Sequence, residues 1–413
     1  MQPDPSQDGE VRKTGPLAGV RILDLSSVVM GPYATMILAN LGADVIKVEA
    51  PEGDIMRRVG PMRNPNMGHS FLNANHGKRS IVLDLKCPEG RTAALELSKT
   101  VDVFVHNIRT AALKRLGLDY DSVAAVNPKI IYASAIGFGS RGRYSGKPAY
   151  DDLIQGIVGL PSLMVEAGGE IPRYLPTPVA DRSVGLYLSS MISAALYSRE
   201  KSGRGQSVEV PMFEVLSQYV LGDHMAGLSY EPAQGGPYYT RLISKDRRPY
   251  KTEDGYICAL LYNDTHWRAF FDLIGEPEKF NADKRFSSQT ARGENIDEVY
   301  AFVSPILESK TSEQWLLLFE ENDIPAMPLA TIPSLLEDPH LNDVGFFDYK
   351  DHPTEGRLRM MNPPETWSDT PSSVSGFAPN LGEHSEEILA EIGMTPEQIE
   401  QALITVNKSQ KKK

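Results

Sequence analysis

The chain has 413 residues, of which 41% are hydrophobic and 23% are charged, and its formal net charge at neutral pH is −12. This length and composition predict a globular protein with two domains, or one large domain that carries a smaller insert. The excess of acidic residues argues against nucleic acid as the main partner, although a few clustered cations suffice to hold an anionic cofactor.

No segment has the pattern of a membrane anchor or an export signal. The longest apolar run, at 186–197, is interrupted by serines and is shorter than the ~20 residues that span a bilayer. Cys87 and Cys258 lie far apart, which is typical of free thiols in a reducing compartment. None of the histidines falls at metal-ligand spacing. We therefore expect a cytoplasmic protein without a membrane or metal partner, and disordered tails at 1–15 and 406–413.

Strand-like and helix-like segments alternate through the first half of the chain. Apolar, β-branched runs predict strands at 19–26, 43–49, 79–85, 102–107 and 129–136. The segments 33–42 and 88–100 have helical spacing; the first closes on a glycine, and the second opens with Pro88, which a first helical turn tolerates. This alternation predicts right-handed βαβ units and a mostly parallel, Rossmann-like sheet.

The second half begins with a long helix predicted from Asp181 to about residue 200, then a strand at QSVEV and a helix that opens at Pro211. The stretch 231–256 is rich in Gly, Pro and charge, which is typical of a linker, and 256–325 favours a small α/β insert. Prolines near 333 and 363 suggest a return to the first domain. The predicted fold is an α/β large domain from 16–225 and 331–405, with a linker and small domain at 226–330.

The segment GFGSRG at 137–142 matches the GxGxxG pattern of dinucleotide-binding loops. The residues RYSGKP that follow contain Gly and Pro and cannot begin a helix cleanly. No Asp or Glu occurs at 153–165, where a ribose-binding carboxylate would stand. We therefore interpret the segment as a flexible glycine turn.

Three further features leave two interpretations open. Gly31-Pro32 opens a helix, so its free N–H groups face a phosphate or adenine, or the pair forms a plain tight turn. Lys78 and Arg79 precede a strand and either neutralise phosphates or lie on a solvated edge. His106 ends a strand, where a packed or capping histidine is commoner than a ligand.

Asp181, in PTPVADRSVGLYL, is the most informative acidic residue. An Asp immediately before an apolar helical run is a good helix N-cap, and the local sequence taken alone favours that role. The dipole and free N–H groups of a helix N-terminus also keep a carboxylate ionised, and the ionised form is a nucleophile. The two roles are compatible.

Nine motifs, in order from about Pro16 to Met394, resemble those of the class III CoA-transferase family (CaiB/BaiF type). This family includes formyl-CoA, carnitine and succinyl-CoA-dependent transferases. The motifs are PLAGVRILDLSSVVMGPYAT, LGADVIKVEAPEGD with Arg57 or Arg58, NANHGKRSIVLDLK, DVFVHNIR, LGLDY with NPKIIYASAIGFG, PAYDDLIQG, PVADRSVGLYL, KSGRGQSVEVPMFE and LGEHSEEIL. The resemblance implies an interlocked homodimer that moves CoA from an acyl-CoA donor to a small free carboxylic acid.

The resemblance makes Asp181 the nucleophile. It implies that the aspartate attacks the donor thioester to give a mixed anhydride, and that exchange continues through an aspartyl-CoA thioester and a second anhydride, with backbone N–H groups stabilising the oxyanions. Coenzyme A is then a substrate, and no permanently bound cofactor is implied. The CoA-binding positions that the family pattern carries over are Val29, Met30, Ala50, Leu83, Asp84, Leu85, Lys86, Asn107, Ile108, Arg109, Arg115, Lys147, Pro148, Ala149 and Tyr150.

The sequence departs from the family pattern at three places. Val29 stands where some members have a glutamine, so no substrate contact carries over there. Ala50 stands where they have an arginine, which removes one cationic CoA contact. The Gly-rich lid of formyl-CoA transferase is missing, and Gly235-Gly236 is its nearest remnant.

Two other functions remain alternatives. The α-methylacyl-CoA racemases resemble this chain, but they use a His before the Asp of the AYDD motif as one of two paired bases. Tyr150 stands there, and a phenol with an unperturbed pKa of about 10 is a poor base at neutral pH. A non-catalytic protein that binds CoA thioesters has no need of the intact Asp181.

The sequence does not identify the acids that are exchanged. Arg241, Lys245 or Arg247, in the linker, are candidates for binding the distal carboxylate of a dicarboxylic acid such as succinate. The alternative is that all three are exposed linker charges.

Overall fold

The computed structural model describes residues 14–411, which form two compact units. The larger unit is built from residues up to Ile154, Thr177–Ser217 and the chain from His340 on; the smaller is built from Gln155–Pro176 and Gln218–Pro339. The domain boundaries predicted above stay a prediction, because such units are groups of mutual contacts and not pieces shown to fold alone.

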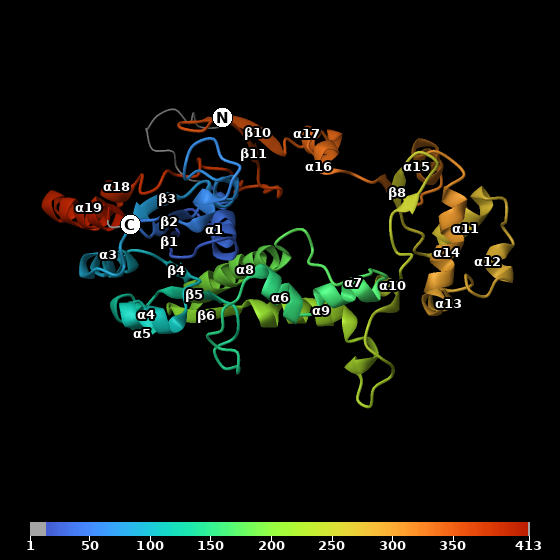
Figure 1. The fold of residues 1–413 in the computed structure, drawn as a ribbon, viewed down its shortest axis with the longest axis horizontal. Coiled ribbons are helices and arrows are strands. Elements are labelled where there is room, and N and C mark those ends of the chain that lie inside the picture. Colours follow the sequence, from blue (N-terminus) through green and yellow to red (C-terminus); the bar gives the residue numbers. More distant parts are fainter. Residues whose placement is uncertain (1–13, 412–413) are drawn as a thin grey trace. The chain divides into compact units, whose positions relative to one another are not determined.

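A six-stranded parallel sheet forms the centre of the larger unit (Figure 1). Its order is β3-β2-β1-β4-β5-β6, so successive strands are added on one side of β1 and then on the other. In such sheets ligands bind at the carboxyl ends of the strands, where the order reverses. The predicted α/β fold with a parallel sheet is confirmed. The strands are β1 (Arg21–Asp24), β2 (Asp44–Glu49), β3 (Arg79–Val82), β4 (Val103–His106), β5 (Ile131–Ile136) and β6 (Gln206–Pro211).

Helices connect these strands, and Pro88 is the first residue of the second long one, as predicted. Among the described residues, three helices contain residues of both units, namely α6, α9 and α17 (Pro339–Asp343). The helices of this part are α1 (Met30–Asn40), η1 (Ile55–Arg58), α2 (His69–Asn75), α3 (Pro88–Ser98), α4 (Thr110–Leu116), α5 (Tyr120–Val126), α6 (Asp151–Ile157), α8 (Val179–Ser202), α9 (Met212–His224), α18 (Ser385–Glu391) and α19 (Pro396–Lys411).

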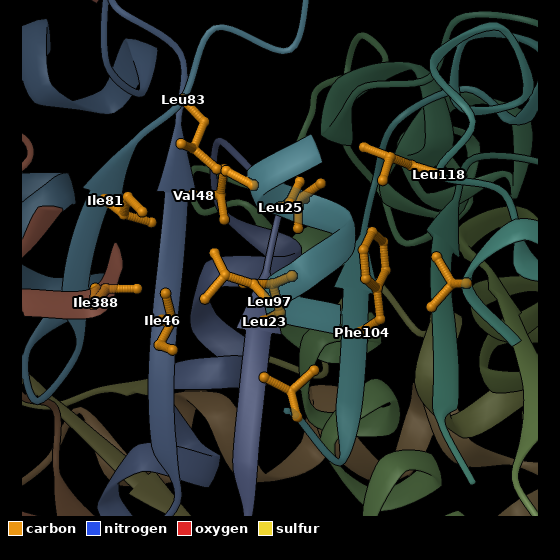
Figure 2. Packing of buried hydrophobic residues seen from close by; sticks show 14 of the residues in the cluster. Leu23, Leu25, Ile46, Val48, Ile81, Leu83, Leu97, Phe104, Leu118 and Ile388 are labelled. Carbon is orange, nitrogen blue, oxygen red and sulfur yellow. The ribbon is translucent and has the colours of Figure 1, made fainter. Parts of the chain in front are cut away.

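One face of the sheet carries an apolar core (Figure 2). Alternate residues of a strand point to opposite faces, so Leu23, Ile46, Ile81 and Phe104 all point to this side, where Leu97 of α3 packs against them. All five side chains are fully buried. The cluster also contains residues of α4, α5, α18 and α19, so this face is closed to ligands.

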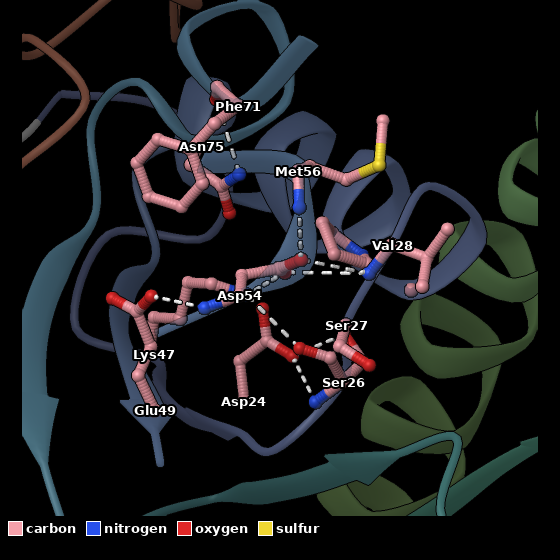
Figure 3. A network of polar contacts seen from close by, with 12 residues as sticks. Asp24, Ser26, Ser27, Val28, Lys47, Glu49, Asp54, Met56, Phe71 and Asn75 are labelled. Atoms are coloured by element: carbon pink, nitrogen blue, oxygen red, sulfur yellow. Dashed lines mark hydrogen bonds and ion pairs between the residues drawn. The ribbon is translucent and has the colours of Figure 1, made fainter. Parts of the chain in front are cut away.

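The intervening strand residues point to the opposite face and include a buried polar set. Asp24, Lys47, Glu49 and Ser80 are all at most 3% exposed. In a sequence, polar residues at every second position resemble the solvated face of a sheet. Here they belong to a network of ion pairs and hydrogen bonds, in which Ser80 donates to Glu49 and Lys47 pairs with Asp54. Figure 3 shows Asp24, Lys47 and Glu49 of this network, which supports the carboxyl ends of the strands.

The smaller unit contains a three-stranded antiparallel sheet, in the order β7 (Tyr250–Lys251), β8 (Tyr256–Ala259) and β9 (Ala326–Pro328). Its core is aromatic, with Trp267, Phe270, Phe286 and Trp315 fully buried. Its helices are α7 (Leu160–Glu166), η2 (Ala226–Ser229), α10 (Thr240–Ile243), α11 (Asp264–Leu273), α12 (Lys279–Ala282), α13 (Gln289–Glu294), α14 (Ile296–Leu307), α15 (Ser312–Glu321) and α16 (Ile332–Leu335).

The return segment begins with α17 (Pro339–Asp343) and the hairpin β10 (Phe347–His352) and β11 (Gly356–Met361). At the end of the chain α19 continues to Lys411, so the tail predicted to be disordered from 406 begins with helical residues. Residues 1–13 and 412–413 of the predicted tails lie outside the described residues. Within 14–411 no helix combines the length and apolarity needed to cross a bilayer.

Candidate active site

Asp181 is the third residue of α8 and not its N-cap, so the cap prediction is wrong. The helix begins at Val179, because Pro178 needs no N–H partner and its carbonyl already accepts the N–H of Arg182 at 3.0 Å. The N–H of Asp181 has no acceptor within its own first turn, and it donates to Oδ1 of Asp151 at 2.9 Å. A second carboxylate, 30 positions earlier in the chain, therefore holds the backbone at Asp181.

Two effects raise the pKa of Asp181 to about 7. Burial of the carboxyl group is the larger one, and the negative charge of Asp151 adds to it, while the charge of Arg182 acts in the opposite direction. The helix dipole, expected to keep this group ionised, is outweighed. Asp181 therefore titrates in the neutral range, so its protonated and ionised forms are both populated near pH 7.

Asp181 lies on the wall of a cavity of about 260 Å³ at the carboxyl ends of β1, β4 and β5. Residues from the turn before α1, from the segment after β4 and from the long loop after β5 form the rest of the wall. Eight of the predicted CoA-binding residues are brought together there with Asp181, namely Val29, Met30, Asn107, Arg109, Lys147, Pro148, Ala149 and Tyr150.

A second cavity, of about 640 Å³, opens at the carboxyl ends of β2 and β3. It is lined by six more of the predicted residues, namely Ala50, Leu83, Asp84, Leu85, Lys86 and Ile108. Arg115 lies on an exposed part of α4 and lines neither of these two cavities. The predicted residues thus form two groups on one edge of the sheet, with a single residue outside them.

The turn between β1 and α1 is fixed on both sides. Val28 has a φ of 74°, a left-handed conformation that costs a β-branched residue about 1–3 kcal/mol. Its N–H lies 3.3 Å from both carboxylate oxygens of Asp54, and Asp54 is paired with buried Lys47 at 3.0 Å (Figure 3). On the other side, Asn107 bonds the N–H and the carbonyl of Ser27 at 3.1 and 2.7 Å. This network holds the strained turn that forms one wall of the Asp181 cavity.

Helix α8 packs closely against α1 at Gly185, one turn after Asp181. A Cβ atom at Gly185 would stand 2.9 Å from the carbonyl oxygen of Met30 and 3.1 Å from the ring of Tyr33. The neighbouring Arg182 guanidinium stacks over the same Tyr33 ring at 4.4 Å. Gly185 therefore allows the contact that brings Asp181 beside the first turn of α1.

Gly185→Ala should push the two helices apart and lower the rate of CoA transfer by about tenfold or more, since a displacement of 1 Å at a reacting group is enough for such a loss. The matched control is Gly222→Ala in α9, where an added Cβ meets nothing within 4 Å. Initial rates of both variants test this. Equal rates for Gly185→Ala and wild type would contradict the positioning role.

The glycine segment 137–142 forms a loop without a helix after it, which confirms the interpretation as a turn. The next helix begins at Asp151. The loop is tied down by two carboxylates: Glu214 accepts the N–H of Gly139 at 2.9 Å, and Glu209 accepts that of Ser140 at 2.8 Å. The loop thereby presents Gly137, Phe138 and Ser140 to the Asp181 cavity.

Lys78 and Arg79 both form ion pairs with carboxylates of the protein. The solvated-edge interpretation is therefore wrong for Lys78, while Arg79 is half-buried on the edge strand β3. Lys78 is fully buried and pairs with Asp24 at 3.2 Å, while Arg79 pairs with Asp44 at 2.6 Å. His106 is a packed histidine, as its position favoured: its ring nitrogens lie 2.8 Å from Ser134 Oγ and 3.1 Å from a backbone carbonyl. Burial lowers the pKa of His106 to about 4, so the ring is neutral.

Four residues of the site were missed by sequence reasoning. Asp151 was visible only as part of the AYDD motif, and Gly185 only as part of the motif around Asp181. Lys47 and Asp54 were visible only as part of the motif LGADVIKVEAPEGD, because nothing in the sequence shows that they pair with each other or that Asp54 holds Val28. All four position other groups.

The fold and these cavities define an α/β protein with a ligand site at the switch point of a parallel sheet. Residues 17–385 match the model of CoA-transferase family III, and the chain therefore belongs to that family. This confirms the family that its motifs resemble, and with it the class of enzyme.

The chain is 33% identical over 386 residues to a succinate–glutarate CoA-transferase of Agrobacterium fabrum, with 91% of this chain and 96% of that protein covered. It is 32% identical over 406 residues to a formyl-CoA:oxalate CoA-transferase of Bradyrhizobium diazoefficiens, with 92% and 94% covered. A crystal structure of a CaiB/BaiF family protein from Brucella suis matches with a TM-score of 0.76 and 30% identity, over 92% of this chain and 100% of that one.

Proposed function

We propose that this enzyme moves CoA from an acyl-CoA donor to a free carboxylic acid through covalent intermediates on Asp181. One observation carries the proposal: among the described residues that line the first cavity, Asp181 is the only carboxylate and none is a histidine. A single carboxylate suffices for nucleophilic catalysis, whereas a racemase needs a second base at the same carbon. Tyr150 lines this cavity at the position where the racemases carry their histidine base, and this departure supports transfer over racemisation.

In the first half of the proposed reaction, a carboxylate oxygen of Asp181 attacks the thioester carbonyl. The C–S bond breaks, CoA leaves as a thiolate, and a mixed anhydride remains. The thiolate then attacks the aspartyl carbonyl, which releases the donor acid and leaves an aspartyl-CoA thioester.

In the second half, the acceptor carboxylate attacks the carbonyl of this thioester. CoA leaves again as a thiolate, and a second mixed anhydride forms between Asp181 and the acceptor acid. The thiolate then attacks the acyl carbon of the second anhydride, which gives the product thioester and restores the Asp181 carboxylate. Each step exchanges an anhydride for a thioester or the reverse, two groups of similar reactivity.

The first turn of α1 supports the binding of negative charge beside Asp181. Met30 and the preceding Val29 line the cavity at this helix N-terminus, whose N–H groups have no acceptor within the helix. Arg109 and Lys147 add two cations to the wall. We propose that these groups stabilise the oxyanions and the thiolate, and that Lys86, on the wall of the second cavity, contacts another part of CoA.

The family resemblance also implies an interlocked homodimer, which we propose for this chain. We also propose the cytoplasmic location that its two separate cysteines indicate. Leu186, Tyr187 and Tyr197 on α8 are 40–67% exposed, although two of them are large aromatic residues. A second copy would cover this apolar surface. Sedimentation of the purified protein tests the proposal, and a monomer at micromolar concentration would contradict it.

The function is tested by incubating the enzyme with acyl-CoA donors and free acids, with mass spectrometry of the new thioesters. Succinate, glutarate and oxalate are the first acids to test, because they occur in the names of the relatives. Transfer that requires both substrates is expected. A parallel reaction with a 2-methylacyl-CoA in deuterated water separates the alternatives, since rapid α-deuterium uptake without an acceptor acid would show a racemase.

A further inference from the structure

The smaller unit contains a cavity of about 430 Å³ beside its antiparallel sheet. This volume lies within the range of small-molecule sites. The walls come from α10 and the residues after it, from the adjacent ends of β7, β8 and β9, and from α14. None of the residues assigned to CoA binding or to the reaction lines it.

Positive charge without a matching carboxylate distinguishes this cavity. Arg241, Arg247 and Arg248 line it, and none of the other described lining residues is an Asp or Glu. Arg248 is paired with Asp246 at 3.3 Å, but within the part of the chain that the structure describes, neither Arg241 nor Arg247 has a carboxylate partner. The Arg241 guanidinium lies over the Tyr262 ring at 5.7 Å, a contact that leaves its charge unneutralised. In a protein with a net charge of −12, two guanidinium groups without a carboxylate partner on one cavity wall create a local site for anions.

Two phenol groups stand beside these arginines. Tyr250 and Tyr300 line the cavity although only 6% and 8% of their surfaces are exposed. Burial raises the pKa of Tyr250, and the neighbouring Tyr300 adds to the shift, so the Tyr250 hydroxyl stays protonated at neutral pH. Among residues 14–411 neither hydroxyl has a hydrogen-bond partner, so both are open to an acceptor on a ligand.

The remaining wall is largely apolar and includes the side chains of Pro249, Leu260, Pro325 and Met327. A guanidinium group binds one carboxylate through a fork of two N–H donors, so a single carboxylate satisfies one arginine and leaves the second available. The ligand that matches this wall carries two carboxylates joined by a short aliphatic segment.

We propose that this cavity is a binding site for a small aliphatic dicarboxylate, with one carboxylate on Arg241 and the other on Arg247. This inference rests on the proposed function in one respect: the ligand belongs to the class of free acids that exchange CoA. Because both of its carboxylates are held by arginines, the acid in this cavity is bound at a second site and is not the molecule that attacks at Asp181. Lys245, the third candidate of the linker, is not among the lining residues. The sequence left open whether these linker cations bind a carboxylate or are merely exposed charges. The cavity favours carboxylate binding for Arg241 and Arg247.

Direct binding to the full-length protein, without CoA, is the first test. Calorimetric titration with glutarate should show saturable binding, and Arg241→Gln and Arg247→Gln should each weaken it by about tenfold or more, since a hydrogen-bonded charge pair is lost. Arg268→Gln is the matched control: Arg268 is exposed in the same unit, stacks over Phe280 at 3.9 Å, and does not line the cavity. Butyrate or phosphate that binds as tightly as glutarate, or equal affinity in all three variants, would overturn the proposal.

Cys258 provides a second readout, because it is exposed and lines the cavity. The chain has two cysteines, so Cys87→Ser leaves Cys258 as the only thiol. Iodoacetate and iodoacetamide alkylate a thiolate in the same way, but only iodoacetate carries a carboxylate. The ratio of the iodoacetate rate to the iodoacetamide rate should be several times higher for Cys258 in the Cys87→Ser protein than for free cysteine, because the arginines attract the carboxylate of iodoacetate. This ratio should fall when Arg241 or Arg247 is replaced. It should also fall when glutarate is added. A ratio that none of these changes affects would contradict the site.

The two proposals can fail separately. Asp181→Asn should bind glutarate as the wild type does. If the wild type transfers CoA to glutarate and the two arginine variants bind glutarate as tightly as the wild type does, the site falls and transfer stands. If glutarate binds as described but no donor yields a new thioester, the site stands and the proposed reaction falls.

Discussion

Asp181→Asn is expected to lower the turnover of CoA transfer by more than about 10³-fold, since loss of a nucleophile removes the covalent route itself. The amide keeps the shape of the side chain, and the N–H of Asp181 keeps its bond to Asp151. Binding of CoA, measured by calorimetry, should therefore remain within about threefold of the wild type. Turnover near the wild-type value would remove Asp181 from the chemistry.

The raised pKa of Asp181 gives the reaction a defined pH dependence. The ionised carboxylate attacks, and burial together with the charge of Asp151 raises its pKa to about 7. The value of kcat/KM should therefore fall about tenfold per pH unit below pH 7 and level off above it. Asp151→Asn removes the negative charge that helps to raise the pKa of Asp181. This variant should therefore shift the pH at which kcat/KM levels off to a lower value. A profile that is flat from pH 5 to 8 would contradict this assignment.

Protein stability gives an independent check on the same group. An acid whose pKa is raised by folding binds its proton more tightly in the native state, so stability falls as pH rises from the unfolded value of about 4 to about 7. Asp181→Asn should therefore have a higher Tm than the wild type at pH 8, and the difference should shrink toward pH 4. If Asp181→Asn loses activity but is more stable than the wild type at pH 8, the loss of activity is due to the missing nucleophile and not to a disrupted structure.

The sheet could be predicted because its strands are buried on the face that carries the apolar core. The segment 43–49, for example, was predicted as a strand and is observed as Asp44–Glu49. The same segment shows where sequence reasoning ends. Lys47 and Glu49 follow the period of two that a solvated face would have, yet both are buried, because their partners are Asp54 and Arg57. Only the folded chain brings those partners into place.

At the candidate site, Asp181 could be identified from its motif, but its helix position and its pKa could not. The start of α8 depends on Pro178, and the pKa depends on burial and on Asp151, which is 30 positions away. Val28 is a stronger example, since a left-handed conformation is least expected for a β-branched residue. Its conformation is enforced by Asp54, whose role has no local signal.

Glu49→Gln is expected to lower the free energy of unfolding by about 3–5 kcal/mol, because it leaves the buried guanidinium of Arg57 without its counter-charge. Arg57 binds Glu49 through two hydrogen bonds, of 2.7 and 2.6 Å, and both side chains are 1% exposed. The guanidinium also stacks over Phe71 at 3.7 Å. The matched control is Glu96→Gln in the exposed pair with Lys99, where the side chains are 42% and 43% exposed and the loss should stay below about 1 kcal/mol.

The pH dependence of this loss identifies its cause. Burial disfavours the Glu49 carboxylate, but the hydrogen bonds from Arg57 and the charges of Lys47 and Arg57 outweigh it and lower the pKa of Glu49. The pair therefore stabilises the protein fully above the unfolded glutamate value of about 4.3, and this contribution is lost as pH falls through the lower native value. Urea unfolding of wild type and Glu49→Gln should thus differ most near pH 7 and converge in acid. Glu49 also accepts the N–H of Asp54 at 3.0 Å, and Asp54 in turn holds Val28. The variant should therefore lose transfer activity as well. A constant difference across pH would show that lost packing, rather than lost charge, sets the stability of this edge of the sheet.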